Sequence, residues 1–109
     1  MDILGRWSEL KPADNEVQEI CDQVKPDVEK LLHMKFETFR ALVHRTLLLA
    51  GGMHYLIQVL IEHGEDEDGK YLHEKCLHVR VFSSLERQLD VMNAMNMRPV
   101  TVADKLIPF

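Results

Sequence analysis

The segment 64–71, Gly-Glu-Asp-Glu-Asp-Gly-Lys-Tyr, has nearly the glycine and lysine spacing of a phosphate-binding loop. Tyr71 stands where that pattern needs a serine or threonine, and the four carboxylates of the segment would repel a phosphate. The same carboxylates lack the ligand spacing of an EF-hand calcium loop. We therefore interpret the segment as a solvated acidic turn, and we expect neither a metal ion nor a cofactor.

Two histidines and a cysteine are the other candidates for chemistry. His73 and His78 are five positions apart, so on a strand they would face opposite sides of a sheet and could not share a metal ion. We expect both on the surface of a sheet. Cys21 would need a nearby base and an oxyanion hole to act as a nucleophile, but it falls on the apolar stripe of a predicted helix. Because no nucleophile–base pair is recognisable, we expect that the protein is not an enzyme.

The remaining candidate is the apolar segment 47–53, Leu-Leu-Leu-Ala-Gly-Gly-Met, which carries two adjacent glycines. Glycine accepts a positive φ, so this segment predicts a tight hairpin turn. Apolar residues at such a turn mark either a buried strand end or a binding surface. The pattern alone does not separate these two interpretations.

The spacing of apolar residues predicts a helix that contains Cys21, because they recur at steps of three and four from Val17 to Leu32. Asp14 or Asn15 can cap its first turn. Pro26 removes one backbone hydrogen bond, so we expect a kink there with the apolar stripe continuing past it.

Beyond residue 35 the apolar period changes to two, which predicts strands separated by turns at 50–52 and 64–69 and by a long connection at 83–99. Cys76 alternates with Leu77 and Val79, so we expect it to face outward, away from Cys21 and not bridged to it. One helix followed by antiparallel strands predicts an α+β fold in which the sheet wraps around the helix. The strands are expected at 39–44, 54–61, 76–82 and 100–106.

The composition fits one globular domain spanning residues 1–109, with 46% apolar and 28% charged residues. A net charge of −5 gives no electrostatic attraction to nucleic acid or to a membrane surface, so neither is an expected partner. The apolar stretch 47–61 is too short to span a bilayer, and residues 1–7 lack the apolar core of a signal peptide. With only two cysteines, we expect a cytoplasmic protein with free thiols.

Several segments together resemble the stefins, the cytosolic type 1 cystatins. The carrying segments are Ser-Glu-Leu-Lys-Pro-Ala at 8–13, Glu-Val-Gln-Glu-Ile at 16–20, Val-Lys-Pro at 24–26, Val-Arg-Val-Phe-Ser-Ser-Leu at 79–85 and Asp-Lys-Leu-Ile-Pro-Phe at 104–109. The resemblance implies a cystatin-like fold, with one N-terminal helix wrapped by a four- to five-stranded antiparallel sheet.

Stefins reversibly inhibit papain-like cysteine proteases of the cathepsin type. The resemblance implies a wedge that fills the protease cleft with an N-terminal trunk ending at a glycine, a QxVxG hairpin and a second hairpin carrying Leu-Pro. The glycine of the QxVxG hairpin corresponds to Gly51 or to Gly52, depending on how the motif is aligned with this sequence. The implied protease-binding residues are Ile3, Leu4 and Gly5 in the trunk, Leu47, Leu48, Leu49, Ala50 and Gly51 or Gly52 in the first hairpin, and Leu85 and Glu86 in the second.

This sequence departs from the family pattern at two of these positions. Leu47 replaces the motif glutamine, and Glu86 replaces the proline of the second hairpin. A carboxylate that enters a protease cleft costs desolvation energy unless it is paired, so we expect Glu86 to weaken cleft entry. The alternative function is therefore a non-inhibitory stefin-fold module for interaction or self-association, with a homodimer formed by hairpin exchange as one form of it. For an inhibitor, the leucines at 47–49 should be exposed.

Overall fold

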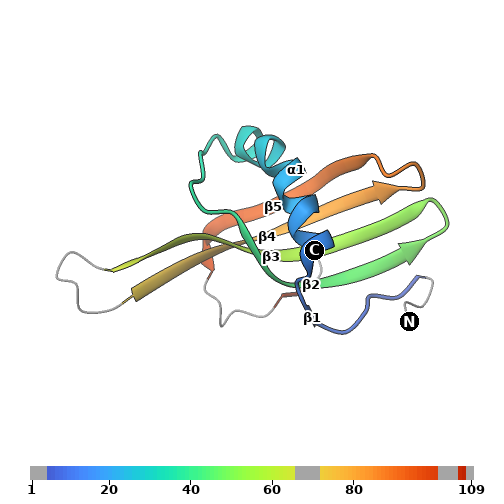
Figure 1. Cartoon of the computed structure of the whole chain (residues 1–109), viewed down its shortest axis with the longest axis horizontal. Helices are drawn as coiled ribbons and strands as arrows, with labels where there is room; N and C mark the ends of the chain where they lie inside the picture. Colours follow the sequence, from blue (N-terminus) through green and yellow to red (C-terminus); the bar gives the residue numbers. More distant parts are fainter. Residues whose placement is uncertain (1–4, 66–71, 101–105, 108–109) are drawn as a thin grey trace.

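In the computed structural model, one helix lies across one face of an antiparallel sheet (Figure 1). The structure describes residues 5–65, 72–100 and 106–107. Each strand pairs with the next in chain order, and this arrangement confirms the predicted cystatin-like α+β fold. The elements are β1 (Lys11–Pro12), α1 (Asn15–Leu32), β2 (Arg40–Leu49), β3 (Gly52–Glu65), β4 (Leu72–Ser84) and β5 (Leu89–Val100).

Helix α1 begins and ends as its sequence requires. Of the two candidate caps, Asp14 is the one used, because its carboxylate accepts a hydrogen bond of 2.9 Å from the N–H of Val17. The helix continues unbroken through Pro26, with Val24 and Val28 buried on either side, so the apolar stripe continues as predicted. A kink at the proline stays a prediction. Beyond the helix, His33 adopts the left-handed conformation with φ of 55°.

The core lies between α1 and the face of the sheet that the helix covers. Each aliphatic side chain buried there contributes about 1.5–3 kcal/mol to folding. Cys21 is 1% exposed and belongs to this core, as predicted. The side chains that meet there include Val17, Ile20, Val24 and Val28 from α1, Ile57 and Val59 from β3, and Leu77, Val79 and Val81 from β4.

A glutamine fixes α1 against the start of β2. The side-chain amide of Gln18 donates a hydrogen bond of 3.1 Å to the carbonyl of Phe39. Its oxygen accepts a bond of 2.8 Å from the N–H of Ala41. The edge backbone of β2 is therefore satisfied by the helix at this point.

The opposite face of the sheet is also covered, which corrects two expectations. Cys76 and His78 do face away from the helix, but they are buried, with 0% and 6% of their surface exposed. Chain segments at Trp7 and Leu106 lie against this face, through contacts with arginines of β4 and β2. The alternation therefore predicted the direction of these side chains correctly, whereas the expected surface position was wrong.

The strands differ from the prediction in extent and number. The predicted strands at 39–44, 54–61 and 76–82 are present as the longer β2, β3 and β4, with the turn at 50–51 between β2 and β3. The connection predicted at 83–99 is wrong, because β5 occupies most of it and pairs with β4. Two shifts in the β4–β5 register interrupt the alternation that would have revealed β5. Of the strand expected at 100–106, Val100 is the last residue of β5, and residues 101–105 lie outside the described part.

Two further expectations concern the acidic turn, which is only partly described, and the absence of a membrane-spanning segment. The prediction puts a turn at 64–69, but Gly64 and Glu65 belong to the end of β3, and residues 66–71 lie outside the described part. In the described residues, no helix has the length and apolar character needed to cross a bilayer.

Candidate functional site

Three chain segments that are distant in sequence meet at one end of the sheet (Figure 1). Gly52, at the start of β3, pairs with Ser84, at the end of β4, so the β2–β3 and β4–β5 turns are neighbours. The N–H of Gly5 donates a hydrogen bond of 2.7 Å to the carbonyl of Leu48, next to the first turn. We call this end the turn edge, formed by residues 5–7, 47–52 and 84–88.

The two glycines of the first turn have different roles in the backbone. Gly52 has a φ of 150°, and a Cβ there would collide with the carbonyl oxygen of Ser83 and lie 3.0 Å from Phe82 and Ser84 atoms. Gly51 is exposed, and no atom lies within 4 Å of the position a Cβ would take. The backbone therefore strongly favours glycine at position 52, whereas position 51 has room for a side chain.

The second turn is closed by its own hydrogen bonds. The N–H of Arg87 donates to the carbonyl of Ser84 at 2.9 Å, and the N–H of Ser84 donates to the carbonyl of Gln88 at 3.0 Å. Arg87 has a φ of 63°, which is uncommon outside glycine. The turn presents Leu85, which is 77% exposed, and the neighbouring exposed carboxylate of Glu86.

The N-terminal segment runs antiparallel to the end of β2. Trp7 forms a bridge with Leu47, and Ser8 exchanges hydrogen bonds with Thr46 through its N–H at 2.7 Å and its Oγ at 2.9 Å. The guanidinium of Arg80 lies 5.5 Å from the centre of the Trp7 ring, within the range of a cation–π contact. Gly5 turns the chain with a φ of 76°. Ile3 and Leu4, the other predicted trunk residues, lie outside the described residues.

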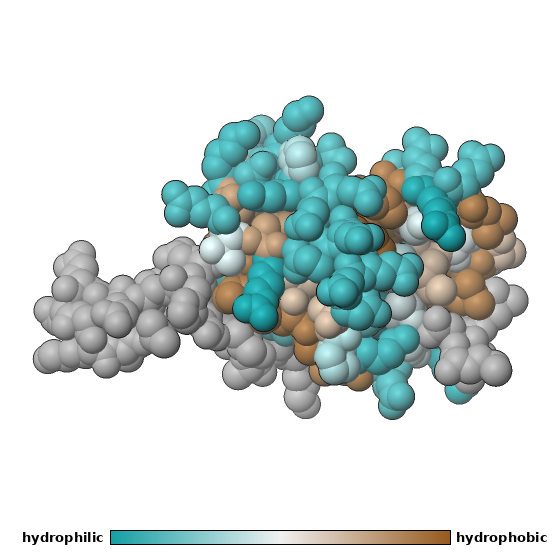
Figure 2. Space-filling view, in the orientation of Figure 1, coloured by the Kyte–Doolittle hydropathy of each residue, from teal (hydrophilic) through white to brown (hydrophobic). Residues whose placement is uncertain are grey.

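The three leucines of the first hairpin differ in exposure. Leu49 is 37% exposed, whereas Leu47 and Leu48 are half-buried at the end of β2. Leu47 is flanked on one side by Trp7 and on the other by His54 of β3. The expected exposure is therefore found at Leu49 and only in part at its two neighbours. Figure 2 shows hydrophobic surface at this end of the molecule, in contrast to the hydrophilic face of the helix.

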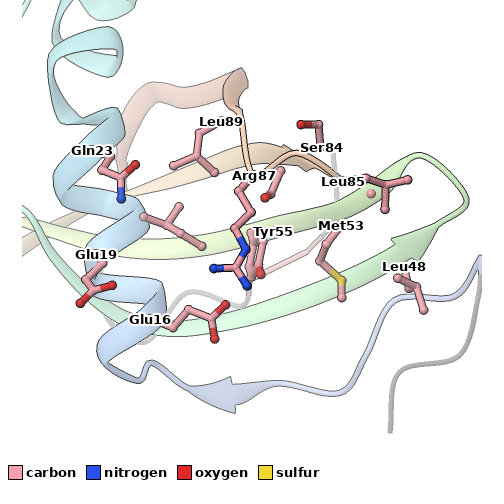
Figure 3. Close-up of a pocket in the computed structure, with 13 residues that line it drawn as sticks. Glu16, Glu19, Gln23, Leu48, Met53, Tyr55, Ser84, Leu85, Arg87 and Leu89 are labelled. Carbon is pink, nitrogen blue, oxygen red and sulfur yellow. The ribbon is translucent and has the colours of Figure 1, made fainter.

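A groove of about 560 Å³ separates the turn edge from α1. Figure 3 shows that Arg87 points from the second turn toward the helix, where Glu16 and Glu19 lie. Met53 and Tyr55 of β3 lie below it. The groove therefore has an apolar floor with charged side chains at its rim.

The residues first considered for catalysis do not form a site. Burial raises the pKa of the Cys21 thiol to about 12, and the neighbouring Asp22 adds to this rise, so the thiol stays protonated. Both cysteines are free, as predicted. His78 is buried, and His73 belongs to β4 at a position whose side chain is not described. Within residues 5–65, 72–100 and 106–107, no three potential ligands gather in a way that could hold a metal ion.

Sequence reasoning missed four residues that shape the turn edge. Trp7 had a usable signal, because it is the one tryptophan of the chain and follows the trunk glycine by two positions. Arg45 and Arg80 act through partners that are far away in sequence, so no local pattern marks them. The position of Arg87 depends on its positive φ, and an arginine in the sequence does not predict a positive φ.

Comparison with known proteins adds the family. No protein-family model matches the chain. Stefin-C from Bos taurus is 39% identical over 85 residues, which cover 78% of this chain and 73% of stefin-C. Cystatin-A from Homo sapiens is 36% identical and cystatin-A from Felis catus 35% identical, each over 86 residues that cover 79% of this chain and 76% of the relative. By this similarity and by its fold, the chain belongs to the stefin, or type 1 cystatin, family.

Proposed function

We propose that this protein is a reversible inhibitor of papain-like cysteine proteases of the cathepsin type, and that its turn edge occludes the active-site cleft. A relative from Sus scrofa that is 32% identical is named leukocyte cysteine proteinase inhibitor 1. Membership in this family also means that the protein is not an enzyme.

The convergence of three segments at the turn edge is the observation that carries the proposal. The Gly52–Ser84 pairing and the bond from Gly5 to Leu48 hold two turns and the N-terminal segment side by side. The exposed apolar side chains at this end are Leu49 and Leu85, one on each turn. A narrow edge with apolar tips is the shape that a cleft between two walls can accept.

Such an edge would inhibit by filling the cleft without presenting a cleavable bond. Each leucine that the protease covers fully would contribute about 1.5–3 kcal/mol. Gly5 would let the N-terminal segment turn away from the nucleophile, because its φ of 76° is freely available to glycine. The turns are fixed by ladder and turn hydrogen bonds before binding, so little conformational entropy would be lost on association.

Introduction of a negative charge at the turn edge tests the proposal against a matched control. Leu49→Asp should weaken inhibition of papain and of a lysosomal cathepsin by about tenfold or more, because a carboxylate would be desolvated in the cleft. Leu31→Asp is the control, since Leu31 is 51% exposed on α1 and does not belong to the turn edge. Equal inhibition by both variants would contradict binding through the turn edge.

Self-association through the same end is the second candidate function. The observation that favours it is the pair of departures from the family pattern, Leu47 and Glu86, which leave an apolar first tip beside a charged second tip. Analytical ultracentrifugation separates the two functions. A dimer that dissociates in Leu49→Asp, in a protein that does not inhibit papain, would favour the self-association module, hairpin exchange included.

We also propose that the protein works in the cytoplasm. Two free, buried thiols support this location, because a reducing compartment keeps thiols unpaired. Cell fractionation with an antibody against the protein tests it, and recovery only from the secreted fraction would contradict it.

A further inference from the structure

One side chain joins the N-terminal segment to the other end of the chain. Arg45, in β2, donates a hydrogen bond of 3.1 Å from Nη1 to the carbonyl of Ser8. Its Nε donates a second bond of 3.0 Å to the carbonyl of Leu106. These acceptors are 37 and 61 positions away from Arg45 in the sequence.

Neither acceptor residue, Ser8 or Leu106, belongs to one of the named strands. Leu106 belongs to no strand, yet only 2% of its surface is exposed, so this residue is seated against the protein. Ser8 is held by Thr46, and three residues earlier Gly5 binds Leu48 at the turn edge. A series of hydrogen bonds therefore connects Leu106 to the N-terminal segment at the turn edge, and the guanidinium of Arg45 is its central member.

The chemistry of arginine suits this bridging position. Its planar guanidinium presents several N–H donors in a fixed fork, so it can bind two carbonyls in different directions at once. Arg80 of β4 also contacts the N-terminal segment, through the ring of Trp7. Arg45 reaches both segments through two separate nitrogen atoms of one guanidinium group.

We propose that Arg45 is a positioning residue that couples the seating of Leu106 to the placement of the N-terminal segment at the turn edge. This inference rests on the proposed function, because the placement matters for binding a protease through residues 5–7. Unseating Leu106 removes one acceptor and lets the guanidinium turn away from Ser8. The N-terminal segment then loses this bond, while its bonds to β2 and its contact with Arg80 stay.

Hydrogen exchange tests the coupling without any protease. Leu106→Ala and Arg45→Met should each speed exchange of the Gly5 and Ser8 amides by about tenfold, which is the scale of one lost charge-assisted hydrogen bond. Val81, in the middle of β4, should not change. Ile107→Ala is the matched control, since Ile107 is the neighbour of Leu106 and is 64% exposed. Unchanged exchange at Gly5 and Ser8 in Leu106→Ala would overturn the proposal.

A double-mutant cycle on papain inhibition distinguishes coupling from general damage. We expect Leu106→Ala to weaken inhibition in the wild-type chain and to have no further effect in the Arg45→Met background, because the link is already broken there. Additive effects would overturn the proposal, since they would show that Leu106 acts by another route. A wild-type protein that does not inhibit papain would contradict the proposed function alone, and hydrogen exchange would still decide on the coupling.

If Arg45→Met does not fold, Arg45→Lys replaces it in the hydrogen-exchange experiment. Lysine keeps the positive charge and the aliphatic stem but lacks the planar fork, so it cannot hold both carbonyls in the same geometry. We expect this variant to speed exchange at Gly5 and Ser8 as well. Wild-type exchange in Arg45→Lys would show that charge alone suffices, and it would contradict a bridging role for the guanidinium.

Discussion

Gly52 and Ser84 lie opposite each other in the β3–β4 ladder, so closely that a Cβ on Gly52 would be 3.0 Å from the Cα of Ser84. This contact brings the ends of two hairpins together without a side chain between them. The hydrogen bond from Gly5 to Leu48 then adds the N-terminal segment on the other side of the first turn. The shape of the turn edge thus depends on Gly52, because the backbone packs too closely there for a side chain.

The first prediction separates the two glycines of the β2–β3 turn. Gly52→Ala should lower the free energy of unfolding by about 1–3 kcal/mol from backbone strain alone, with the overlap against Ser83 adding to it. Gly51→Ala should change it by less than about 0.5 kcal/mol, because space is open around that position. Urea denaturation measures both. Equal stability of the two variants would contradict the described turn.

The second prediction concerns the carboxylate on the second turn. Glu86→Gln and Glu86→Pro should tighten binding to a papain-like protease by about 1–2 kcal/mol, because the charge no longer has to be desolvated. Glu37→Gln is the control, since Glu37 is exposed in the loop between α1 and β2. Unchanged or weaker binding of both Glu86 variants would mean that this carboxylate stays in water or meets a basic group of the protease.

The third prediction concerns the cysteines. The denatured, unreduced protein should show two free thiols per chain, and the native protein should react slowly at both, because Cys21 and Cys76 are 1% and 0% exposed. Burial raises the pKa of the Cys21 thiol to about 12, so mild alkaline pH should not speed its reaction in the folded state. Thiol counting with a chromogenic disulfide measures both states. A count of zero in a denatured monomer would contradict the free thiols and the proposed cytoplasmic location.

The fourth prediction is a pH dependence from His54. Burial, and after it the charge of Arg80, lowers the pKa of this histidine below its ordinary value of 6.5. The unfolded chain therefore binds a proton at His54 more readily than the folded chain, and stability falls as pH decreases from 6.5 toward the folded-state pKa. In His54→Gln this part of the decrease should be absent. Parallel curves of unfolding midpoint against pH for both proteins would contradict the prediction.

The local periodicity of the sequence predicts much of the fold. The helix follows from the apolar spacing between Val17 and Leu32 and from the cap at Asp14, and both depend on neighbouring residues only. The turn at 50–51 follows from adjacent glycines between apolar segments. Strand β5 does not follow, because its register against β4 shifts twice and its apolar alternation is broken.

The cover on the far face of the sheet could not be predicted in this way. Whether Cys76 is buried depends on chain segments that are distant in sequence, and alternation reports only which side a residue faces. The same limit applies to Arg45, whose two acceptors come from opposite ends of the chain. The candidate site itself was predicted from family resemblance, and the structure adds the Gly52–Ser84 contact that holds its turns together.

Titration of papain with the unmutated protein is the most direct test of the central claim. We expect reversible loss of activity at one inhibitor per enzyme, with the chain still intact by mass spectrometry after prolonged incubation. Raising the substrate concentration should restore the activity, because substrate and the turn edge would compete for the same cleft. Full papain activity at micromolar concentrations of this protein, or rapid cleavage of its chain, would contradict inhibition through the turn edge.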